Sequence, residues 1–360
     1  MTRPARAWLD GGALVRNLAQ VRHYAPDSRV MAVVKANGYG HGLAWTAQQL
    51  RGADSFAVTS IEEALELRNC GITDTPVCLL EGFFEANEVA LAAHYRLDVV
   101  IHSSWQLAAL ENADLSGERL DVWLKLDTGM HRLGFPVRDA RTLLARLKAC
   151  RNVRSVRALS HFAQADDLLD PATSQQLRAF VEAVPAGIEG SIANSAGLLD
   201  WPQSRLEWVR PGLMLYGLSP VPGRPASAFG LQPVMTFTSA IIAIHTLPKG
   251  AAVGYGGTFI CPEEMPVGVV AAGYGDGYPR HARSGTPVLV RGRPVPLAGR
   301  VSMDMITVDL RTQTDAQVGD PVVLWGRGLP AEEVAACATT IPYTLVCGVT
   351  PRIPRCVYDQ

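Results

Sequence analysis

A lysine that ends an apolar run is the first residue of this sequence that could do chemistry. Lys35 follows the run Ala32–Val34 and precedes a glycine-rich segment, residues 36–42, which reads ANGYGHG. A lysine at the end of a strand is often only a surface or salt-bridge residue. Beside an open, glycine-rich backbone, however, a desolvated lysine amine has a lowered pKa and is suited to a Schiff base with a carbonyl compound. Lys35 is therefore a candidate for covalent attachment of a ligand.

Several other polar side chains could support such chemistry, and each also has a plainer explanation. Arg132 could hold a planar carboxylate through two parallel hydrogen bonds, but an arginine in a loop is as often a surface residue. Asn194 and Ser195 follow an apolar run and could bind a phosphate at a helix N-terminus, or Asn194 could simply cap that helix. His161 could be a buried, hydrogen-bonded histidine, and Tyr255 an aromatic residue in a hairpin turn.

The elements that must position these residues begin with a repeated pattern in the first two-thirds of the chain. Seven apolar runs alternate with amphipathic stretches and are too apolar to face water on either side, which indicates a parallel sheet. These runs are Val30–Val34, Phe56–Val58, Val77–Leu80, Leu97–Ile101, Leu120–Leu126, Val153–Leu159 and Ile188–Ala193. An eighth strand near Leu206–Arg210 would complete a (β/α)8 barrel, and an open, doubly wound sheet is the competing architecture. In a barrel, reactive residues lie where the strands end, as Lys35 does.

Helices are expected between these runs. The predicted segments are Gly12–Tyr24, Leu43–Arg51, Ile61–Asn69, Glu85–His94, Ser104–Asn112, Val137–Cys150 and Ala172–Val184. Asp10 and Ser60 stand where they could cap the first and the third of them.

The pattern changes after Gly217. Ser219–Gly230 is a linker rich in proline, glycine and serine, and short β-branched runs follow it, which predicts a mainly-β domain. The runs are Val234–Leu247, Val267–Ala272, Thr286–Val290, Ile306–Leu310 and Pro321–Leu324. We therefore expect a barrel domain of residues 1–230 and a β domain of residues 231–360, with which residues 1–10 could pack. The segment Gly273–Gly277 (GYGDG) resembles a dinucleotide-binding loop only superficially, because no helix is expected after it.

The composition favours a globular protein that acts on a small molecule. The 360 residues are 48% hydrophobic and 19% charged, and the net charge of -1 gives no reason to expect nucleic-acid binding. No run of about 18 apolar residues predicts a membrane span, and the N-terminus lacks the apolar stretch of a secretory signal. Seven cysteines without a CxxC pair indicate reduced thiols, so we expect a cytoplasmic protein without a metal site.

The segment AVVKANGYGHG, residues 32–42, resembles the cofactor-attachment signature of the bacterial alanine racemases, the fold-type III pyridoxal-phosphate enzymes. The resemblance recurs in the same order along almost the whole chain. The matching segments are LDTGMHRLGF (126–135), SHFAQADD (160–167), NSAG (194–197), WVRPGLMLYG (208–217), VGYGGT (253–258), GYGDGYPR (273–280), GRVSMDM (299–305) and the region of Tyr343. The Asn37–Gly38 pair departs from the Asn-Ala of many relatives.

This resemblance implies catalytic roles for four residues. Lys35 would hold pyridoxal phosphate and act as one base, and Tyr255 would act as the second, because racemisation removes a proton from one face of the substrate and returns it on the other. Since the ordinary pKa of tyrosine is about 10, neighbours must assist, and His161 matches a residue that tunes this network. Arg210 matches the arginine that faces the pyridine nitrogen. It keeps its own proton, which leaves that nitrogen unprotonated and suppresses transamination.

The resemblance also implies binding roles. The phosphate would be held by Tyr39, Asn194, Ser195, Tyr343 and the backbone of Gly212 and Leu213. Arg132 and the backbone amide of Met303 would hold the substrate carboxylate, with Tyr274 and Asp304 nearby. Lys125 matches a lysine that is carbamylated in many relatives, and the negative charge of the carbamate would fix Arg132.

Lys35 and Tyr255 fall in different expected domains, so the resemblance implies a head-to-tail homodimer with shared active sites. Tyr343, Tyr255 and Met303 would leave room for little beyond a methyl group, which indicates alanine as the substrate. A broader racemase, a decarboxylase of the same fold type, a pyridoxal-phosphate carrier and a scaffold are the alternatives. Arg210 opposes the decarboxylases, which place a carboxylate there, and the β domain opposes the carrier, which resembles the barrel alone. Whether D-alanine would serve as a peptidoglycan precursor or be degraded stays open.

Overall fold

The computed structural model describes residues 3–358. The chain divides into two compact units. One contains residues 15–215 and 220–223, and the other contains residues 216–219 and 224 onward, together with the segment up to residue 14. The predicted boundary near residue 230 stays a prediction.

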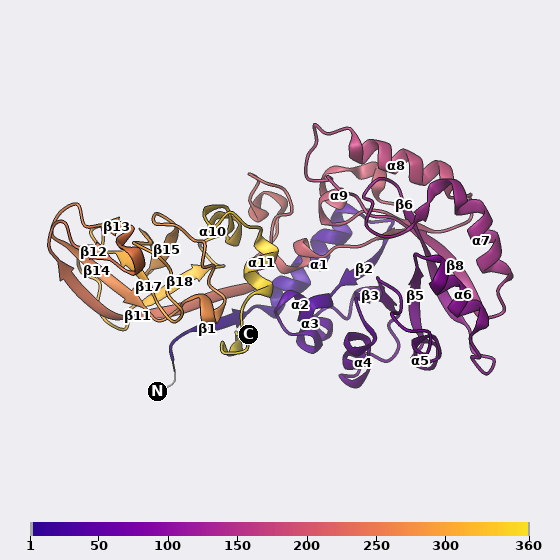
Figure 1. Ribbon diagram of the computed structural model, residues 1–360, viewed down its shortest axis with the longest axis horizontal. Helices are drawn as coiled ribbons and strands as arrows, with labels where there is room; N and C mark the ends of the chain where they lie inside the picture. Colours follow the sequence, from indigo (N-terminus) through magenta and orange to yellow (C-terminus); the bar gives the residue numbers. More distant parts are fainter. Residues whose placement is uncertain (1–2, 359–360) are drawn as a thin grey trace. The chain divides into compact units, whose positions relative to one another are not determined.

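The first unit is a closed parallel barrel (Figure 1). Its strands are β2 Arg29–Val33, β3 Ser55–Val58, β4 Val77–Leu79, β5 Leu97–Ile101, β6 Leu120–Asp127, β8 Val153–Leu159, β9 Gly190–Ser191 and β10 Trp208–Val209. Each strand pairs with the next in sequence, and β10 pairs with β2, with Trp208 opposite Arg29. This closure confirms the (β/α)8 prediction, and the open-sheet alternative is wrong.

Helices follow the strands around the barrel, close to the predicted positions. They are α1 Gly11–Tyr24, α3 Leu43–Gln49, α4 Ile61–Asn69, α5 Glu88–His94, α6 Ser104–Asn112, α7 Ala140–Ala149, α8 Ala172–Ala183 and α9 Ser195–Asp200. Asp10 caps α1, since its carboxylate accepts a hydrogen bond from the Ala13 N–H at 2.8 Å. Ser60 is the N-cap residue of α4, but its side chain makes no capping bond. Helix α5 begins three residues later than predicted, because the Glu88 carboxylate binds the Phe84 N–H at 2.7 Å and holds the preceding residues in a turn.

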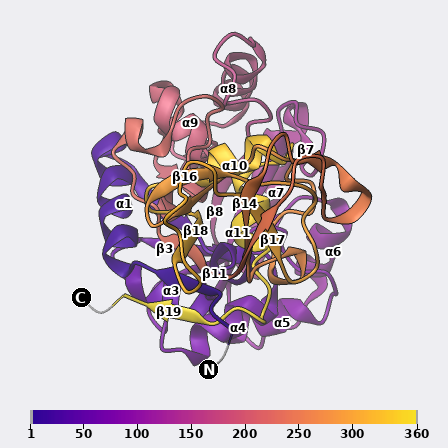
Figure 2. The same cartoon turned by 90° about the vertical axis from the view of Figure 1, so that its left-hand side faces the viewer.

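The second unit is mainly β, as the sequence predicts (Figure 2). Its strands are β1 Arg6–Leu9, β11 Met235–Leu247, β12 Ala252–Val253, β13 Phe259–Ile260, β14 Met265–Val270, β15 Pro287–Val290, β16 Arg293–Pro296, β17 Ile306–Asp309, β18 Pro321–Trp325 and β19 Arg355–Val357. The N-terminal strand β1 lies between β11 and β19 and is antiparallel to the first and parallel to the second. Two short helices, α10 Ala331–Cys337 and α11 Pro342–Cys347, are additions that the sequence pattern did not predict.

Two negative findings apply to residues 3–358. No helix there is long and apolar enough to cross a membrane. The seven cysteines, which all lie in this part of the chain, are free thiols.

A buried carboxylate marks the barrel wall near the amino end of β5. Asp98 is 7% exposed, accepts a hydrogen bond from the Trp123 indole at 3.4 Å and lies 3.6 Å from the Arg157 guanidinium. Burial and the neighbouring Asp121 carboxylate raise the pKa of Asp98 from 3.8 to about 6, despite Arg157 and Trp123. Asp98 therefore binds its proton more tightly in the folded chain. Its contribution to stability is complete below pH 3.8 and is lost as the pH rises through about 6.

We expect Asp98→Asn to gain stability relative to the wild type as the pH rises from 4 to 7. A shift of this size corresponds to about 3 kcal/mol in the difference between the two free energies of unfolding. Urea denaturation at a series of pH values would measure it. Asp121→Asn should have the opposite direct effect, because hydrogen bonds from Arg154 and Ser155 outweigh burial and lower the pKa of Asp121. Part of that effect is offset, since Asp121 no longer raises the pKa of Asp98. Parallel curves for Asp98→Asn and the wild type would contradict the assignment.

Candidate active site

Lys35 directly follows the end of β2 and is partly buried, as the sequence predicts. The chain after it turns in the left-handed sense, with φ of 52° at Ala36, 55° at Asn37, 59° at Gly38 and 49° at Tyr39. A Cβ on Gly38 would lie 2.6 Å from the Thr46 hydroxyl. The packing of Thr46 and the positive φ of this residue therefore account for the glycine at this position.

A buried guanidinium lies at the end of β10. Arg210 is 4% exposed, and its two terminal nitrogens donate to the Ser191 hydroxyl at 2.6 Å and to the Ser160 carbonyl at 2.5 Å. The same side chain lies 3.4 Å from His161 Nδ1. Burial lowers the pKa of Arg210 to about 10, which still leaves it cationic at neutral pH.

Two further titratable groups share this environment. Burial and then Arg210 lower the pKa of His161 well below its ordinary value, so its ring is neutral at pH 7 and can accept a hydrogen bond from Arg210. Lys125, in β6, is 8% exposed, and burial followed by Arg210 and Arg132 lowers its pKa to about 8. The positive charge of Lys35 also lowers the pKa of both His161 and Lys125. The strand ends thus bring five basic side chains into one electrostatic cluster.

Backbone amides gather beside this cluster, at the start of α9 and in the segment after Arg210. The Ser195 hydroxyl accepts hydrogen bonds from the N–H groups of Gly212 at 3.0 Å and Met214 at 3.3 Å. A Cβ on Gly212 would come 2.6 Å from the Tyr39 hydroxyl, so only glycine lets that hydroxyl approach the backbone here. The N–H of Leu213, a residue 1% exposed, donates no hydrogen bond within residues 3–358. Asn194 caps α9 by accepting from the Gly197 N–H at 3.0 Å. Its role toward the phosphate stays a prediction.

These donors fit pyridoxal phosphate. The buried Leu213 N–H needs an acceptor that the described chain does not supply. The basic cluster carries more positive charge than the Glu81 carboxylate beside Lys125 offsets, since burial, Arg210 and Arg132 still lower the pKa of Lys125. A further anion would therefore stabilise it. A phosphate beside Gly212, Leu213 and Ser195, and a lysine amine for an aldehyde, would meet both requirements.

Arg132 lies in an exposed loop after β6. The Asp127 carboxylate shapes this loop by accepting from the N–H groups of Gly129 and His131, both at 3.0 Å. Gln176, on α8, is 3% exposed and hydrogen-bonds to the start of this loop. Its amide donates to the Thr128 hydroxyl at 3.2 Å and to the His161 carbonyl at 3.1 Å. One buried side chain thus joins the loops that carry Arg132 and His161.

The remaining predicted residues lie in the mainly-β unit. Tyr255 is 67% exposed and lies in a short 3-10 turn between β12 and β13, as its plainer explanation expected. Tyr274 and Met303 are joined through their backbones, because the Tyr274 N–H donates to the Ser302 carbonyl at 3.0 Å and the Gly275 N–H to the Met303 carbonyl at 2.8 Å. The N–H of Met303 itself donates no hydrogen bond in the described part of the chain, so it is available to a carboxylate.

Asp304 and Tyr343 complete this group. The Asp304 carboxylate accepts from Arg3 at 3.2 Å and from Arg352 at 2.8 Å. These bonds fix the turn that carries Met303. A place for Asp304 beside the substrate stays a prediction. Tyr343 is the second residue of α11. The loop GYGDG forms a 3-10 turn with no α-helix directly after it, which confirms that it is not a dinucleotide-binding loop.

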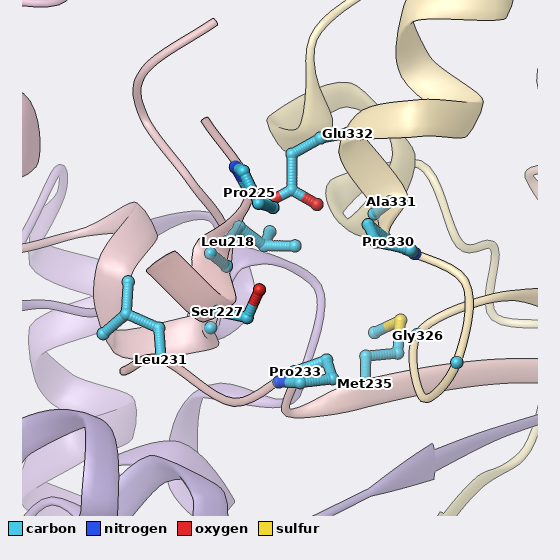
Figure 3. A pocket seen from close by; sticks show the side chains of 13 residues that line it. Leu218, Pro225, Ser227, Leu231, Pro233, Met235, Gly326, Pro330, Ala331 and Glu332 are labelled. Carbon is cyan, nitrogen blue, oxygen red and sulfur yellow. The ribbon is translucent and has the colours of Figure 1, made fainter. Parts of the chain in front are cut away.

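A cavity of about 310 Å³ also lies in this unit (Figure 3). Leu218, Leu231, Met235 and several proline and glycine residues line it, together with Glu332. The Glu332 carboxylate already accepts a hydrogen bond from the Ser219 N–H at 2.5 Å. None of the predicted site residues lines this cavity, so we place the chemistry at the strand ends.

The sequence prediction missed the residues that hold the reactive groups. Ser160 and Ser191 bind Arg210, and Gln176 joins two loops. A signal was present for the serines, since Ser160 directly follows an apolar run and Ser191 is a hydroxyl within one. Gln176 gave none, because a glutamine within an amphipathic helix usually faces solvent.

The fold and the site together define a barrel enzyme of a known kind, with a strand-end lysine, a buried arginine and an amide-lined anion site. Residues 9–220 match the model of the alanine racemase N-terminal domain, and residues 234–357 match that of the alanine racemase C-terminal domain. The chain therefore belongs to the alanine racemase family.

Individual relatives agree over nearly the full length. An alanine racemase of Nitrosococcus oceani is 54% identical over 97% of this chain and 98% of its own length. The biosynthetic alanine racemase of Escherichia coli K12 is 51% identical over 95% of each chain. Among solved structures, the biosynthetic alanine racemase from Pseudomonas aeruginosa superposes with a TM-score of 0.97 at 45% identity, covering 99% of this chain and all of the other.

Proposed function

We propose that this protein is a pyridoxal-phosphate-dependent racemase that interconverts L-alanine and D-alanine. The observation that carries the proposal is the buried, cationic Arg210 held between Ser191 and Ser160 in the same cluster as Lys35. A permanent cation at that position favours racemisation over decarboxylation and transamination. The names of the relatives, which match over nearly the whole chain, support alanine as the substrate.

Pyridoxal phosphate, when bound, would withdraw electrons from the substrate Cα–H bond and make its proton removable near neutral pH. Lys35 would hold the aldehyde carbon, and Ser195, Gly212, Leu213, Asn194, Tyr39 and Tyr343 would hold the phosphate. The Lys35 amine would then take or return the proton on one face of the substrate, and the Tyr255 hydroxyl on the other. Arg132 and the Met303 N–H would fix the substrate carboxylate, with Tyr274 beside them.

A homodimer with shared sites is part of this proposal. The mainly-β unit exposes large side chains in one part of its sequence: Tyr255 is 67% exposed, Tyr274 39% and Met303 52%. Exposed aromatic and methionine side chains are typical of surfaces that another chain covers. We infer that a second copy covers them and that Tyr255 completes the partner's site.

We further propose a cytoplasmic protein that supplies D-alanine as a precursor of peptidoglycan. The seven free thiols fit a reducing compartment. The relatives of E. coli and P. aeruginosa carry the name biosynthetic, which favours supply over degradation.

The direct test measures D-alanine formed from L-alanine by the wild-type protein with added pyridoxal phosphate. The reverse reaction and a parallel assay with serine would separate an alanine racemase from a broader one. A protein that takes up the cofactor but interconverts no amino acid would be a carrier. A protein that releases carbon dioxide from its substrate would be a decarboxylase.

Carbamylation of Lys125 is a separate prediction. Its pKa of about 8 leaves an appreciable neutral fraction near neutral pH, and a neutral amine attacks carbon dioxide to form an N–C bond and release a proton. The carbamate carries a negative charge into a cluster with Arg132 and Arg210, which stabilises it. We expect intact-protein mass spectrometry at mildly alkaline pH with bicarbonate to show one added carbon dioxide, absent from Lys125→Ala. A plain amine in a high-resolution electron-density map would contradict this prediction.

A further inference from the structure

The turn after Lys35 has a conformation that its own residues do not favour. Four consecutive residues, 36–39, have φ between 49° and 59°, and only Gly38 among them lacks a Cβ. The left-handed conformation costs roughly 1–2 kcal/mol for each residue with a Cβ, although Asn37 tolerates it better than Ala36 or Tyr39. Such a segment persists only where surrounding contacts determine it.

Several hydrogen bonds of the turn involve only its own residues and those that flank it in the chain. The Gly38 N–H donates to the Val34 carbonyl at 2.9 Å, and the Asn37 side chain accepts from the Leu43 N–H at 2.9 Å. The ring of His41 lies 3.0 Å from the Gly38 carbonyl oxygen. These bonds close the turn, but none of them ties its first residue to another part of the barrel.

A carboxylate from α4 holds the first residue of the turn. Glu63 Oε1 accepts a hydrogen bond from the Ala36 N–H at 2.7 Å, and its Oε2 accepts from the Thr59 N–H at 2.9 Å. The Ala36 N–H belongs to the peptide bond that follows Lys35, so its direction fixes the backbone torsion ψ of Lys35. One charged group therefore connects the ends of β2 and β3 at the reactive lysine.

This use of Glu63 differs from its ordinary role. Ser60 and Glu63 have the spacing of a capping box, in which the glutamate would bind the N–H of the N-cap residue. Here the carboxylate reaches past Ser60 to Thr59 and Ala36, while the Ser60 side chain makes no capping bond. The structure thus directs the acid toward the lysine turn instead of toward its own helix end.

We propose that Glu63 is a positioning residue for Lys35. Its carboxylate holds the left-handed turn, and thereby keeps the Lys35 amine in the orientation from which it binds the cofactor and exchanges the substrate proton. This inference rests on the proposed function, because it assigns Glu63 to the cofactor-binding role of Lys35.

The test compares Glu63→Gln with Glu62→Gln in the holoenzyme. Both substitutions remove one acid from the first turn of α4, but Glu62 interacts with Ser60 and not with Ala36. Each variant is mixed with hydroxylamine, which competes for the aldehyde, and the loss of the lysine-bound absorbance band is followed without any turnover. We expect Glu63→Gln to lose the band about tenfold faster or more, since a charge-assisted hydrogen bond is removed. Glu62→Gln should stay within about twofold of the wild type.

A second readout separates positioning from stability. We expect the Tm measured by thermal unfolding to fall in both variants, because each loses one favourable charge at the helix start. It should fall by a few degrees more in Glu63→Gln, which also weakens the bonds to Ala36 and Thr59. Equal hydroxylamine rates for Glu63→Gln and Glu62→Gln would overturn the proposal, as would an accelerated rate matched by a much larger fall in Tm. Borohydride reduction of the wild-type holoenzyme tests separately whether the cofactor is attached to Lys35. If it leaves Lys35 unlabelled, the proposed function itself fails, whereas labelled Lys35 with equal rates refutes the role of Glu63 alone.

Discussion

Lys35→Ala is expected to abolish interconversion of the alanine enantiomers, with a loss of at least about a thousandfold. The change removes the proposed covalent anchor and one of the two proton-transfer groups, and a single general base typically contributes 10²–10⁴-fold. The assay couples D-alanine formation from L-alanine to D-amino-acid oxidase, with pyridoxal phosphate in excess so that weak cofactor binding alone does not limit the rate. Lys148→Ala, at an exposed position on α7, is the matched control and should keep wild-type activity. Substantial racemisation by Lys35→Ala would contradict the two-base assignment.

The same variant tests whether active sites are shared between chains. Lys35→Ala and Tyr255→Ala are each expected to be inactive alone. After subunit exchange, a mixed dimer would contain one site with both defects and one intact site. Random mixing in a two-fold dimer then restores about a quarter of the wild-type activity. Tagged subunits would demonstrate that exchange has occurred. If no activity then returns, each chain forms its own site.

Proton exchange in heavy water separates the two bases. Tyr255→Phe keeps Lys35, so it should still exchange the Cα proton of one enantiomer while forming little of the other. Equal loss of exchange for both enantiomers would argue against bases on opposite faces.

The barrel could be predicted from the sequence because its strands are buried on both sides. All five residues of β5 and all four of β3 are buried, and every one of them except Asp98 and Ser55 is apolar, so the strands stand out as apolar runs in the sequence. Even β9 and β10, of two residues each, were located, since they lie within longer apolar segments. Helices α10 and α11 were missed because they are short, seven and six residues, and lie outside the alternation of apolar runs and amphipathic stretches that located equally short helices in the barrel.

The site could be predicted only in part. Reactive side chains such as Lys35 and Arg210 are visible as charges beside apolar runs, and the family resemblance assigns them roles. The left-handed turn is not visible, because Ala36 and Tyr39 carry no preference for positive φ and a hydrogen bond from the Ala36 N–H to Glu63, in another element, helps to hold it. This contact joins residues from different strand ends, which a one-dimensional pattern does not reveal.

Arg210→Glu is expected to change what the enzyme does as well as how fast. A carboxylic acid at this position can share a proton with a pyridine nitrogen, whereas the guanidinium holds its protons too tightly to transfer one. The substitution should therefore lower racemisation by about 10²–10³-fold, the effect of losing a buried electrostatic group. It should also raise transamination, with pyruvate released and the cofactor left in its amine form. Chromatography of pyruvate and cofactor after incubation with L-alanine measures both outcomes.

Arg210→Lys is the matched control for this prediction. It keeps a cation and a donor between Ser191 and Ser160 but loses the planar fork that binds both. We expect Arg210→Lys to racemise alanine more slowly than the wild type and to release no more pyruvate than the wild type does. The environment of His161 gives a second, independent signal. Burial is the first cause of its lowered pKa and Arg210 the second, so removing the guanidinium should raise that pKa in Arg210→Glu and leave it low in Arg210→Lys. Wild-type racemisation by Arg210→Glu, with no pyruvate and an unchanged His161 pKa by NMR, would show that the buried cation does not control the reaction.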